Sequence, residues 1–197
     1  MKRVLQTRLG ALVMLTLVTL VTAMVIKVCF AFNSPTSEET RIVLTNGWNT
    51  YTDTKAGYSF DYPQDAHLSV SHDADSIYNT INIAFELPMT HGYQGMVIRV
   101  EDNPEELSID RLLVRLYMKR SHKTPPSHLA QFIDPITVSG MPAFRTCILP
   151  DVSEFHVFIL HGAKVYDFAP VHDAAANMDA KALSLFYQVL STFTLNP

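Results

Sequence analysis

The chain has 197 residues, 48% of them hydrophobic and 17% charged, a size and composition that predict one globular domain with an appendage. Four of its 15 Lys and Arg residues lie at or before Lys27, so the remainder sets 11 of them against all 19 Asp and Glu and carries about −8. Nucleic-acid phosphates and anionic lipid heads attract clustered Lys and Arg, and we therefore expect neither to be a partner of this acidic remainder.

An apolar segment opens the chain. Residues 9–26 carry no charge, and as a helix they would rise about 27 Å, enough to span a thin hydrocarbon core. Basic residues flank the segment, at Lys2, Arg3, Arg8 and Lys27. Because a basic N-terminus stays in the cytoplasm, we expect the rest of the chain to be exported to the cell envelope.

Two interpretations of this segment stay open, an uncleaved anchor and a cleaved signal peptide. Small residues typical of a cleavage site occur at Ala23 and Ala31. The apolar run continues past Ala23 and is longer than a typical signal core, which favours the anchor. We expect an anchor or signal segment at residues 1–32, a polar linker at residues 33–47 and a folded domain at residues 48–197.

The folded domain opens with an aromatic stretch. Tyr58, Phe60 and Tyr62 alternate with polar residues, which is the period of a half-buried strand. Gly57 suits a turn with positive φ, and Pro63 ends the strand because it has no N–H. We predict a hairpin with strands at residues 50–52 and 58–62 and a loop at residues 53–57.

Three more strands are predicted before the first helix. They cover residues 67–72, 79–86 and 96–101. Ile81 and Ile83 share one face of the second strand. In the third strand Met96, Ile98 and Val100 share one face, and Arg99 lies on the other.

Residues 109–120 carry the clearest helical pattern of the chain. Apolar residues recur at the spacing of a single helix face: Ile109, Leu112, Leu113, Leu116 and Tyr117. We expect Ser108 to be the N-cap. Helix electrostatics explains the flanking charges, which are Glu105, Glu106 and Asp110 near the start and Lys119 and Arg120 near the end.

A β-meander and a last helix complete the domain. The meander strands cover residues 136–138, 142–149, 154–160 and 164–169, joined by short turns. The helix covers residues 178–193, with Asn177 as cap and one apolar stripe: Met178, Ala182, Leu185, Phe186, Val189 and Phe193. Strands and helices in this order predict an α+β layered fold.

Specific catalytic signatures are absent from the sequence. It has no Gly-rich phosphate loop, no Gly-x-Ser-x-Gly elbow, no His-Glu-x-x-His and no Cys-x-x-Cys. A Ser/His/Asp triad has no marked nucleophile. We therefore assign no catalytic, cofactor-binding or metal-ligating residue and predict that the protein is not an enzyme.

Cys147 is the one cysteine beyond the leader, since Cys29 lies beside the apolar segment, and we expect no disulfide within the domain. Arg145, on the same strand face, could make Cys147 a reactive thiol. The simpler interpretation is an inert and mostly buried cysteine.

Acidic residues and histidines give only weak metal-site candidates. Asp73 and Asp75 beside His72 could bind a cation, as could Glu101-Asp102 and Glu105-Glu106, but solvated turns are the preferred interpretation of all three. The remaining histidines considered are scattered along the sequence, and nothing in their spacing brings three together to bind zinc: His122, His128, His156 and His172.

Several motifs resemble those of the PsbP-like family. The stretch Gly57-Tyr-Ser-Phe-Asp-Tyr-Pro63, preceded by Tyr51, resembles the N-terminal hallmark of that family. Val138-Ser-Gly-Met-Pro-Ala143 matches its Val-x-Gly-x-Pro-Ala motif, and Ser191-Thr-Phe193 resembles its terminus. The middle helix is also shared, so the resemblance covers residues 48–195. It departs from the family's envelope lipoproteins in having no lipobox before Cys29.

This resemblance implies an α/β/α sandwich around an antiparallel sheet, preceded here by one N-terminal hydrophobic helix. The family includes an extrinsic photosystem II subunit and bacterial envelope lipoproteins, most of which act by docking on other proteins. No photosystem-binding residue is matched, so none is transferred. Our hypothesis is a membrane-tethered, non-enzymatic accessory domain that binds envelope proteins or a small ligand. The alternative is an envelope hydrolase or metal-dependent enzyme that uses Cys147 or scattered His and Asp residues.

Overall fold

The computed structural model describes residues 47–72, 79–85, 87, 94–149, 155–172 and 178–196. The expected anchor, the expected linker up to residue 46 and the predicted turn at Asp73 and Asp75 lie outside these ranges. Within them, no helix is both long and apolar enough to cross a membrane.

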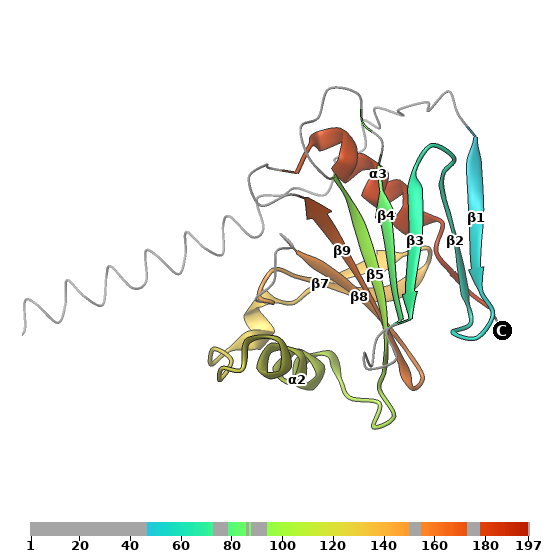
Figure 1. Cartoon of the computed structure of the whole chain (residues 1–197). Helices are drawn as coiled ribbons and strands as arrows, with labels where there is room; N and C mark the ends of the chain where they lie inside the picture. The colour runs from blue at the N-terminus through green and yellow to red at the C-terminus, as the bar shows by residue number, and fades with distance from the viewer. Residues whose placement is uncertain are drawn as a thin grey trace, which may run out of the picture. The chain divides into compact units, whose positions relative to one another are not determined.

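Two antiparallel sheets and two α-helices make up the described fold (Figure 1). The larger sheet runs in the order β3 (His67–His72), β4 (Asn79–Ala84), β5 (Gln94–Asp102), β9 (Lys164–His172), β8 (His156–His161), β7 (Met141–Thr146), β6 (Asp134–Val138). The smaller sheet runs β1 (Trp48–Asp53), β2 (Tyr58–Pro63), β10 (Thr194–Leu195), and the helices are α2 (Ile109–Ser121), the 3-10 turn η1 (Leu129–Phe132) and α3 (Ala180–Ser191).

One face of the larger sheet is covered by α3 and the smaller sheet, and the core between them is rich in aromatic rings. Tyr58 of β2 meets Tyr166 of β9 edge-on, with ring centroids 5.5 Å apart. Phe193, just after α3, lies between Tyr58 and Phe168, at 5.5 and 4.9 Å. All four rings are almost fully buried, so this face is held chiefly by apolar burial and ring packing.

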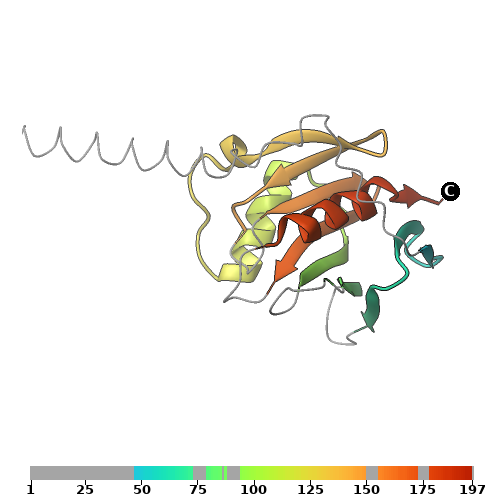
Figure 2. The same cartoon turned by 90° about the horizontal axis from the view of Figure 1, so that it is seen from above.

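The opposite face of the larger sheet is covered by α2 and η1 (Figures 1 and 2). Leu112, Leu113 and Leu116 of α2 are fully buried and pack with Phe158 of β8 and Val165 of β9. Alternation along the strands explains the division between faces, since Val157 and Ile159 flank Phe158 in β8 but belong to the aromatic core.

The predicted opening hairpin is confirmed, and each strand is somewhat longer than expected. Tyr51 lies opposite Phe60 across β1 and β2. The Asp53 carboxylate accepts hydrogen bonds from the N–H groups of Lys55 and Ala56, and Gly57 has φ of 74°. This turn therefore uses an Asp side chain as well as the glycine that the sequence indicated.

The predicted helix at residues 109–120 is confirmed as α2, including its apolar stripe. Ser108 occupies the N-cap position, but its hydroxyl donates to Asp110 and does not cap the helix. The predicted strands are confirmed as β3 to β9, and the reversal between β6 and β7 places both Ser139 and Gly140 at positive φ.

The last helix is shorter than predicted. It begins at Ala180, with Asp179 as the N-cap that accepts from the Lys181 N–H, so the expected cap at Asn177 is wrong. It ends at Ser191 because the next residues form β10, which pairs with β2. The α+β class is correct, but the strands form two sheets where one was expected.

Candidate functional site

Charged side chains gather beneath the C-terminal half of α2. Arg99 of β5 lies directly opposite Asp167 of β9, and β8 borders β9 on its other side. Asp167 interrupts the apolar run of β9. Because side chains alternate along a strand, Asp167 points to the α2 face while the adjacent Tyr166 and Phe168 point into the aromatic core. Strand alternation thus brings a carboxylate under the helix.

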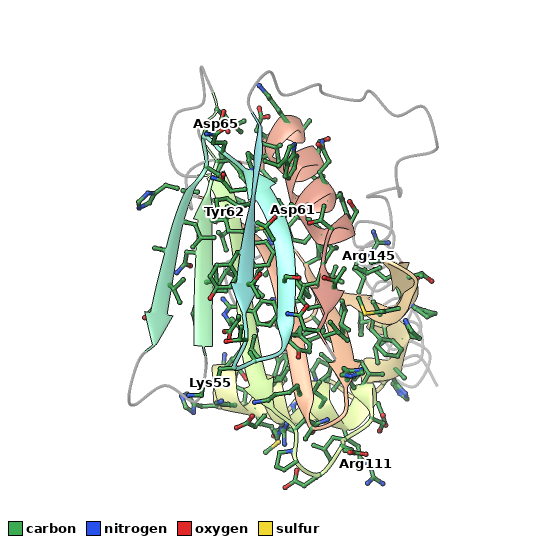
Figure 3. All side chains as sticks on the ribbon, turned by 90° about the vertical axis from the view of Figure 1, so that its right-hand side faces the viewer. Lys55, Asp61, Tyr62, Asp65, Arg111 and Arg145 are labelled. Atoms are coloured by element: carbon green, nitrogen blue, oxygen red, sulfur yellow. The ribbon has the colours of Figure 1, made fainter. Side chains whose placement is uncertain are left out.

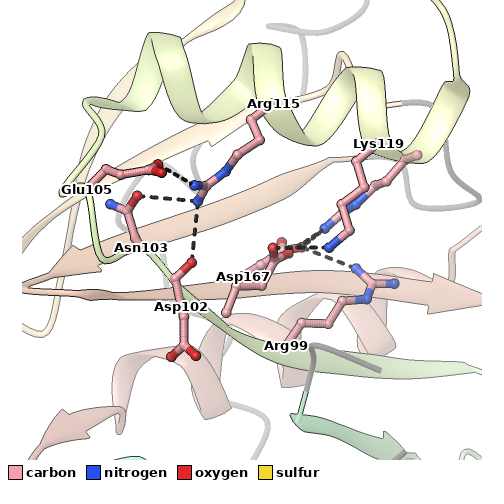
Figure 4. A network of polar contacts seen from close by, with 9 residues as sticks. Arg99, Asp102, Asn103, Glu105, Arg115, Lys119 and Asp167 are labelled. Atoms are coloured by element: carbon pink, nitrogen blue, oxygen red, sulfur yellow. Dashed lines mark hydrogen bonds and ion pairs between the residues drawn. The ribbon is translucent and has the colours of Figure 1, made fainter. Parts of the chain in front are cut away.

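Three cationic or polar groups surround the Asp167 carboxylate, which has no exposed surface. Its Oδ1 lies 2.7 Å from His156 Nδ1. Its Oδ2 accepts from Arg120 at 2.8 Å and from Arg99 at 3.2 Å. Figure 4 shows the contact between Arg99 and Asp167. Both carboxylate oxygens are therefore occupied by protein groups.

A second carboxylate, Glu101, lies beside this cluster with 5% of its side chain exposed. Arg120 bridges the two acids, since it also reaches Glu101 at 3.4 Å. Lys119 lies 4.0 Å from Glu101. We call these six residues the α2 ionic network: Arg99, Glu101, Lys119, Arg120, His156 and Asp167.

The pKa values of the two acids in the network shift in opposite directions. Burial alone would raise the pKa of the Asp167 carboxyl, but His156, Arg120 and Arg99 outweigh burial and hold that pKa below its ordinary value. Burial raises the pKa of Glu101 and the Asp167 carboxylate raises it further, while Arg120 and Lys119 compensate only in part. Because burial disfavours the charged form, it lowers the pKa of the Lys119 amine.

The network opens to solvent at one end, in a cavity of about 330 Å³ lined by Glu101, Asp102, Arg115 and Lys119. Arg115 is held at its rim by Glu105 at 3.1 Å, by Asn103 at 3.3 Å and by the Asp102 carbonyl at 3.4 Å (Figure 4). Acidic and basic residues both line the cavity, and the most buried of them is Glu101.

The His156–Asp167 contact has the geometry of a catalytic dyad but not the access that catalysis requires. The side chains of His156 and Asp167 are 1% and 0% exposed. The His156 ring stacks on Phe158 with centroids 5.8 Å apart. A general base must come within hydrogen-bond reach of a substrate proton, and this imidazole is enclosed. The arrangement positions α2 on the sheet.

This network corrects the expectations drawn from the sequence for Glu101, Lys119 and Arg120. Glu101 was expected in a solvated turn, yet it is buried and paired. Helix electrostatics was expected to account for Lys119 and Arg120, but both form ion pairs with sheet residues. The signal that could have revealed the site is a charged or polar residue inside an apolar strand, as at His156 and Asp167.

Cys147 is disulfide-bonded in the structure, so the interpretation of Cys147 as a reactive thiol is wrong. It lies just after β7 and is half-buried against the aromatic core. The other cysteine of the chain, Cys29, lies outside the described residues. Arg145 pairs with Asp134 across β6 and β7 at 2.7 Å. Because a disulfide sulfur is not a thiolate, Cys147 in this state is not a nucleophile.

The other candidate ligands do not converge within the described residues, where no group of three His, Cys, Asp or Glu is placed to hold a metal ion. His122 ends α2 and His128 precedes η1, both at positive φ. Glu105 is 65% exposed and pairs with Arg115. The candidate pair Asp73 and Asp75 lies outside the described ranges.

The topology defines a PsbP-like fold, as the motifs had predicted. No family model matches the chain, and no curated protein matches it. Among solved structures, it is similar to cyanobacterial PsbP (CyanoP) from Synechocystis sp. PCC 6803, with a TM-score of 0.50 and 14% sequence identity over 78% of this chain and 95% of that one. At this identity the similarity establishes the fold alone.

Proposed function

We propose that this chain is a non-catalytic accessory domain, held at the exported side of a membrane by its N-terminal segment, that works by binding other proteins through its surface. The observation that carries the proposal is the α2 ionic network. Its best candidate for chemistry, His156 with Asp167, is enclosed, and both oxygens of Asp167 are already bound by protein groups.

Other features agree with this role. The PsbP-like fold belongs, by the resemblance described above, to a family whose members mostly dock on other proteins. The acidic charge beyond residue 27 and the basic, apolar N-terminus agree with an exported domain. The rival hydrolase would need a thiolate at Cys147 or an accessible histidine paired with a carboxylate. Cys147 is disulfide-bonded, and His156, which is paired with Asp167, is enclosed.

Complementation tests whether the network does chemistry. In a strain that lacks the protein, the full chain with His156→Gln should restore the wild-type phenotype once its folded level is matched. Gln keeps a polar group near Asp167 but cannot act as a general base. Loss of complementation by a folded His156→Gln chain would overturn the non-catalytic assignment. The exposed Lys164→Gln variant is the matched control, since Lys164 is 42% exposed.

Location and binding are tested in the same strain. Protease added outside spheroplasts should digest the domain, and digestion only after lysis would place it in the cytosol and overturn the proposal. A photo-crosslinking amino acid at Met118, which is 53% exposed on α2, and one at Val70 on β3 sample two surfaces. Specific adducts with envelope proteins from either position support a docking role.

A further inference from the structure

The outer edge of the smaller sheet is an open pairing surface. β1 is six residues long, and among the described strands it pairs only with β2 (Figure 1). Trp48, Thr50 and Thr52 are all exposed, and Trp48 keeps 38% of its surface. A strand edge of this kind presents unpaired N–H and C=O groups that another strand can complete.

Pro63 fixes which backbone groups of β1 face outward. Trp48 lies opposite Pro63, which has no N–H, so this pair is not of the doubly hydrogen-bonded kind. Bonded and non-bonded pairs alternate along an antiparallel ladder, so Asn49, Tyr51 and Asp53 bond to β2. The N–H and C=O groups of Trp48, Thr50 and Thr52 therefore point away from the sheet.

The other edges of the two sheets are less suited to pairing. β6 carries Pro135, and β10 has two residues. β3 continues into residues that the structure does not describe. Strand edges are usually protected by proline, by lysine or by a bulge that breaks the register. β1 has none of these.

Thr50 is the natural centre of a two-fold pairing of β1 with itself. In that antiparallel register, Thr50 faces Thr50 of the second copy, and Trp48 faces Thr52 of the second copy at both ends. Threonine–threonine and aromatic–β-branched pairs are favourable across strands. Asp53 is the only charged residue of β1, and the two-fold axis places its two copies at opposite ends, so no like charges meet.

We propose that β1 pairs with β1 of a second copy of this chain, which joins two three-stranded sheets into one continuous sheet with two-fold symmetry. The outward N–H and C=O groups of Trp48, Thr50 and Thr52 supply the hydrogen bonds. The inference rests on the proposed function, because it names one surface and one partner for a domain that acts by binding.

Disulfide cross-linking of the full chain in its native membrane tests the register. Directly opposed Cα atoms lie about 5.5 Å apart in a bonded pair, within disulfide range, so Thr50→Cys should form a dimer at twice the 22.1 kDa chain mass. Asp61→Cys is the matched control. Asp61 lies opposite Thr50 on β2 and accepts its hydroxyl hydrogen bond, so both variants lose the same contact. Figure 3 labels Asp61 on this sheet.

In the proposed dimer, the two Asp61→Cys residues lie three strand spacings apart. That distance is about 15 Å, beyond the reach of a disulfide. We expect at least tenfold more dimer from Thr50→Cys than from Asp61→Cys. Equal yields, or no dimer from Thr50→Cys, would overturn the proposal. A product of any other mass would assign the edge to a different protein and would also overturn self-pairing.

A second measurement uses sedimentation of the purified full chain in detergent. Thr50→Pro removes an N–H that points to the free edge, where proline is tolerated, and should weaken dimerisation at least tenfold. Thr50→Val keeps that N–H and should change the dissociation constant less than threefold. A folded Thr50→Pro chain that dimerises like the wild type contradicts the proposal; if that variant unfolds, cross-linking decides. A monomeric chain that still cross-links to envelope proteins from Met118 would overturn self-pairing and leave the accessory function standing.

Discussion

On one face of the seven-stranded sheet, α3 and the small sheet enclose aromatic rings; on the other, α2 packs leucines at one end and ions at the other. Burial of rings is non-directional and tolerates small shifts. The contacts of Asp167 with Arg120 and Arg99 each require a defined geometry. Buried ion pairs add little net stability compared with apolar packing of the same volume, yet losing one partner is costly. The two faces should therefore respond differently to substitution and to pH.

The largest effect is expected on the ionic face. Asp167→Ala leaves Arg99, Arg120 and His156 without their shared carboxylate and should lower the free energy of unfolding by about 3–5 kcal/mol, measured by urea denaturation at pH 7. The exposed ion pair between Lys164 and Asp102 provides the control, and Lys164→Ala should cost less than about 1 kcal/mol. Similar losses from both variants would show that the network is not the anchor of α2.

Truncation on the aromatic face comes next in size. Leu185 of α3 is 3% exposed, and Leu185→Ala should cost about 2–5 kcal/mol through lost burial and the cavity left behind. Because no titrating group is removed, the loss should be the same at pH 3 and pH 7. The loss from Asp167→Ala, measured in parallel, should shrink at the lower pH. A pH-dependent loss for Leu185→Ala would mean that the two faces are coupled.

A smaller effect should appear in the pH profile of the wild-type protein. Asp167 has a pKa below 3.8 when folded, so its contribution is present above that value and is lost as pH falls through the folded pKa. Glu101 has a pKa above 4.5 when folded, so its contribution is present below that value and is lost as pH rises through the folded pKa. Stability should therefore peak at mildly acidic pH.

Urea midpoints measured between pH 3 and pH 8 would test this profile. Glu101→Gln should flatten the decline toward neutral pH and leave the acid limb in place. Glu105→Gln, at a 65% exposed position, should change neither limb. A wild-type midpoint that rises steadily from mildly acidic to neutral pH would contradict the assignment for Glu101.

The smallest effect distinguishes two tyrosines within the aromatic core. The Tyr166 hydroxyl donates to the Ala56 carbonyl at 2.9 Å, whereas the buried Tyr58 hydroxyl has no hydrogen-bond partner among the described residues. Tyr166→Phe should cost about 1 kcal/mol, and Tyr58→Phe should be neutral or stabilising by about 1 kcal/mol. Thermal unfolding of the two variants side by side measures the difference. A destabilised Tyr58→Phe would indicate a hydrogen bond at that hydroxyl.

Hydrophobic periodicity predicted the elements in which buried residues recur at a regular spacing. The stripe of α2 and the alternation of Tyr58 and Phe60 depend on neighbours within a few residues, so the sequence was sufficient for them. The end of α3 was not predictable in this way. Phe193 continues the apolar stripe, but the chain leaves the helix to pair Thr194 with Ser59, a partner that only the assembled fold provides.

The ionic network was missed for a similar reason. Arg99 and Arg120 lie 68 and 47 residues from Asp167 in sequence, and they meet it only through the strand order and the packing of α2 on the sheet. His156 is closer, 11 residues away across a single hairpin. In the observed register Phe158 lies opposite Asp167, which places His156 diagonal to Asp167 on the same face.

The closing strand β10 has a consequence for how the chain matures. Ser59 bonds to Thr194, and the Asn196 N–H donates to the Gly57 carbonyl at 2.8 Å, so the first hairpin of the domain is completed by its last residues. During translation Thr194 and Leu195 leave the ribosome after all the other described strands. The nascent domain therefore cannot close its small sheet until Leu195 has emerged, and truncation before Thr194 would leave the β10 side of β2 without its partner strand.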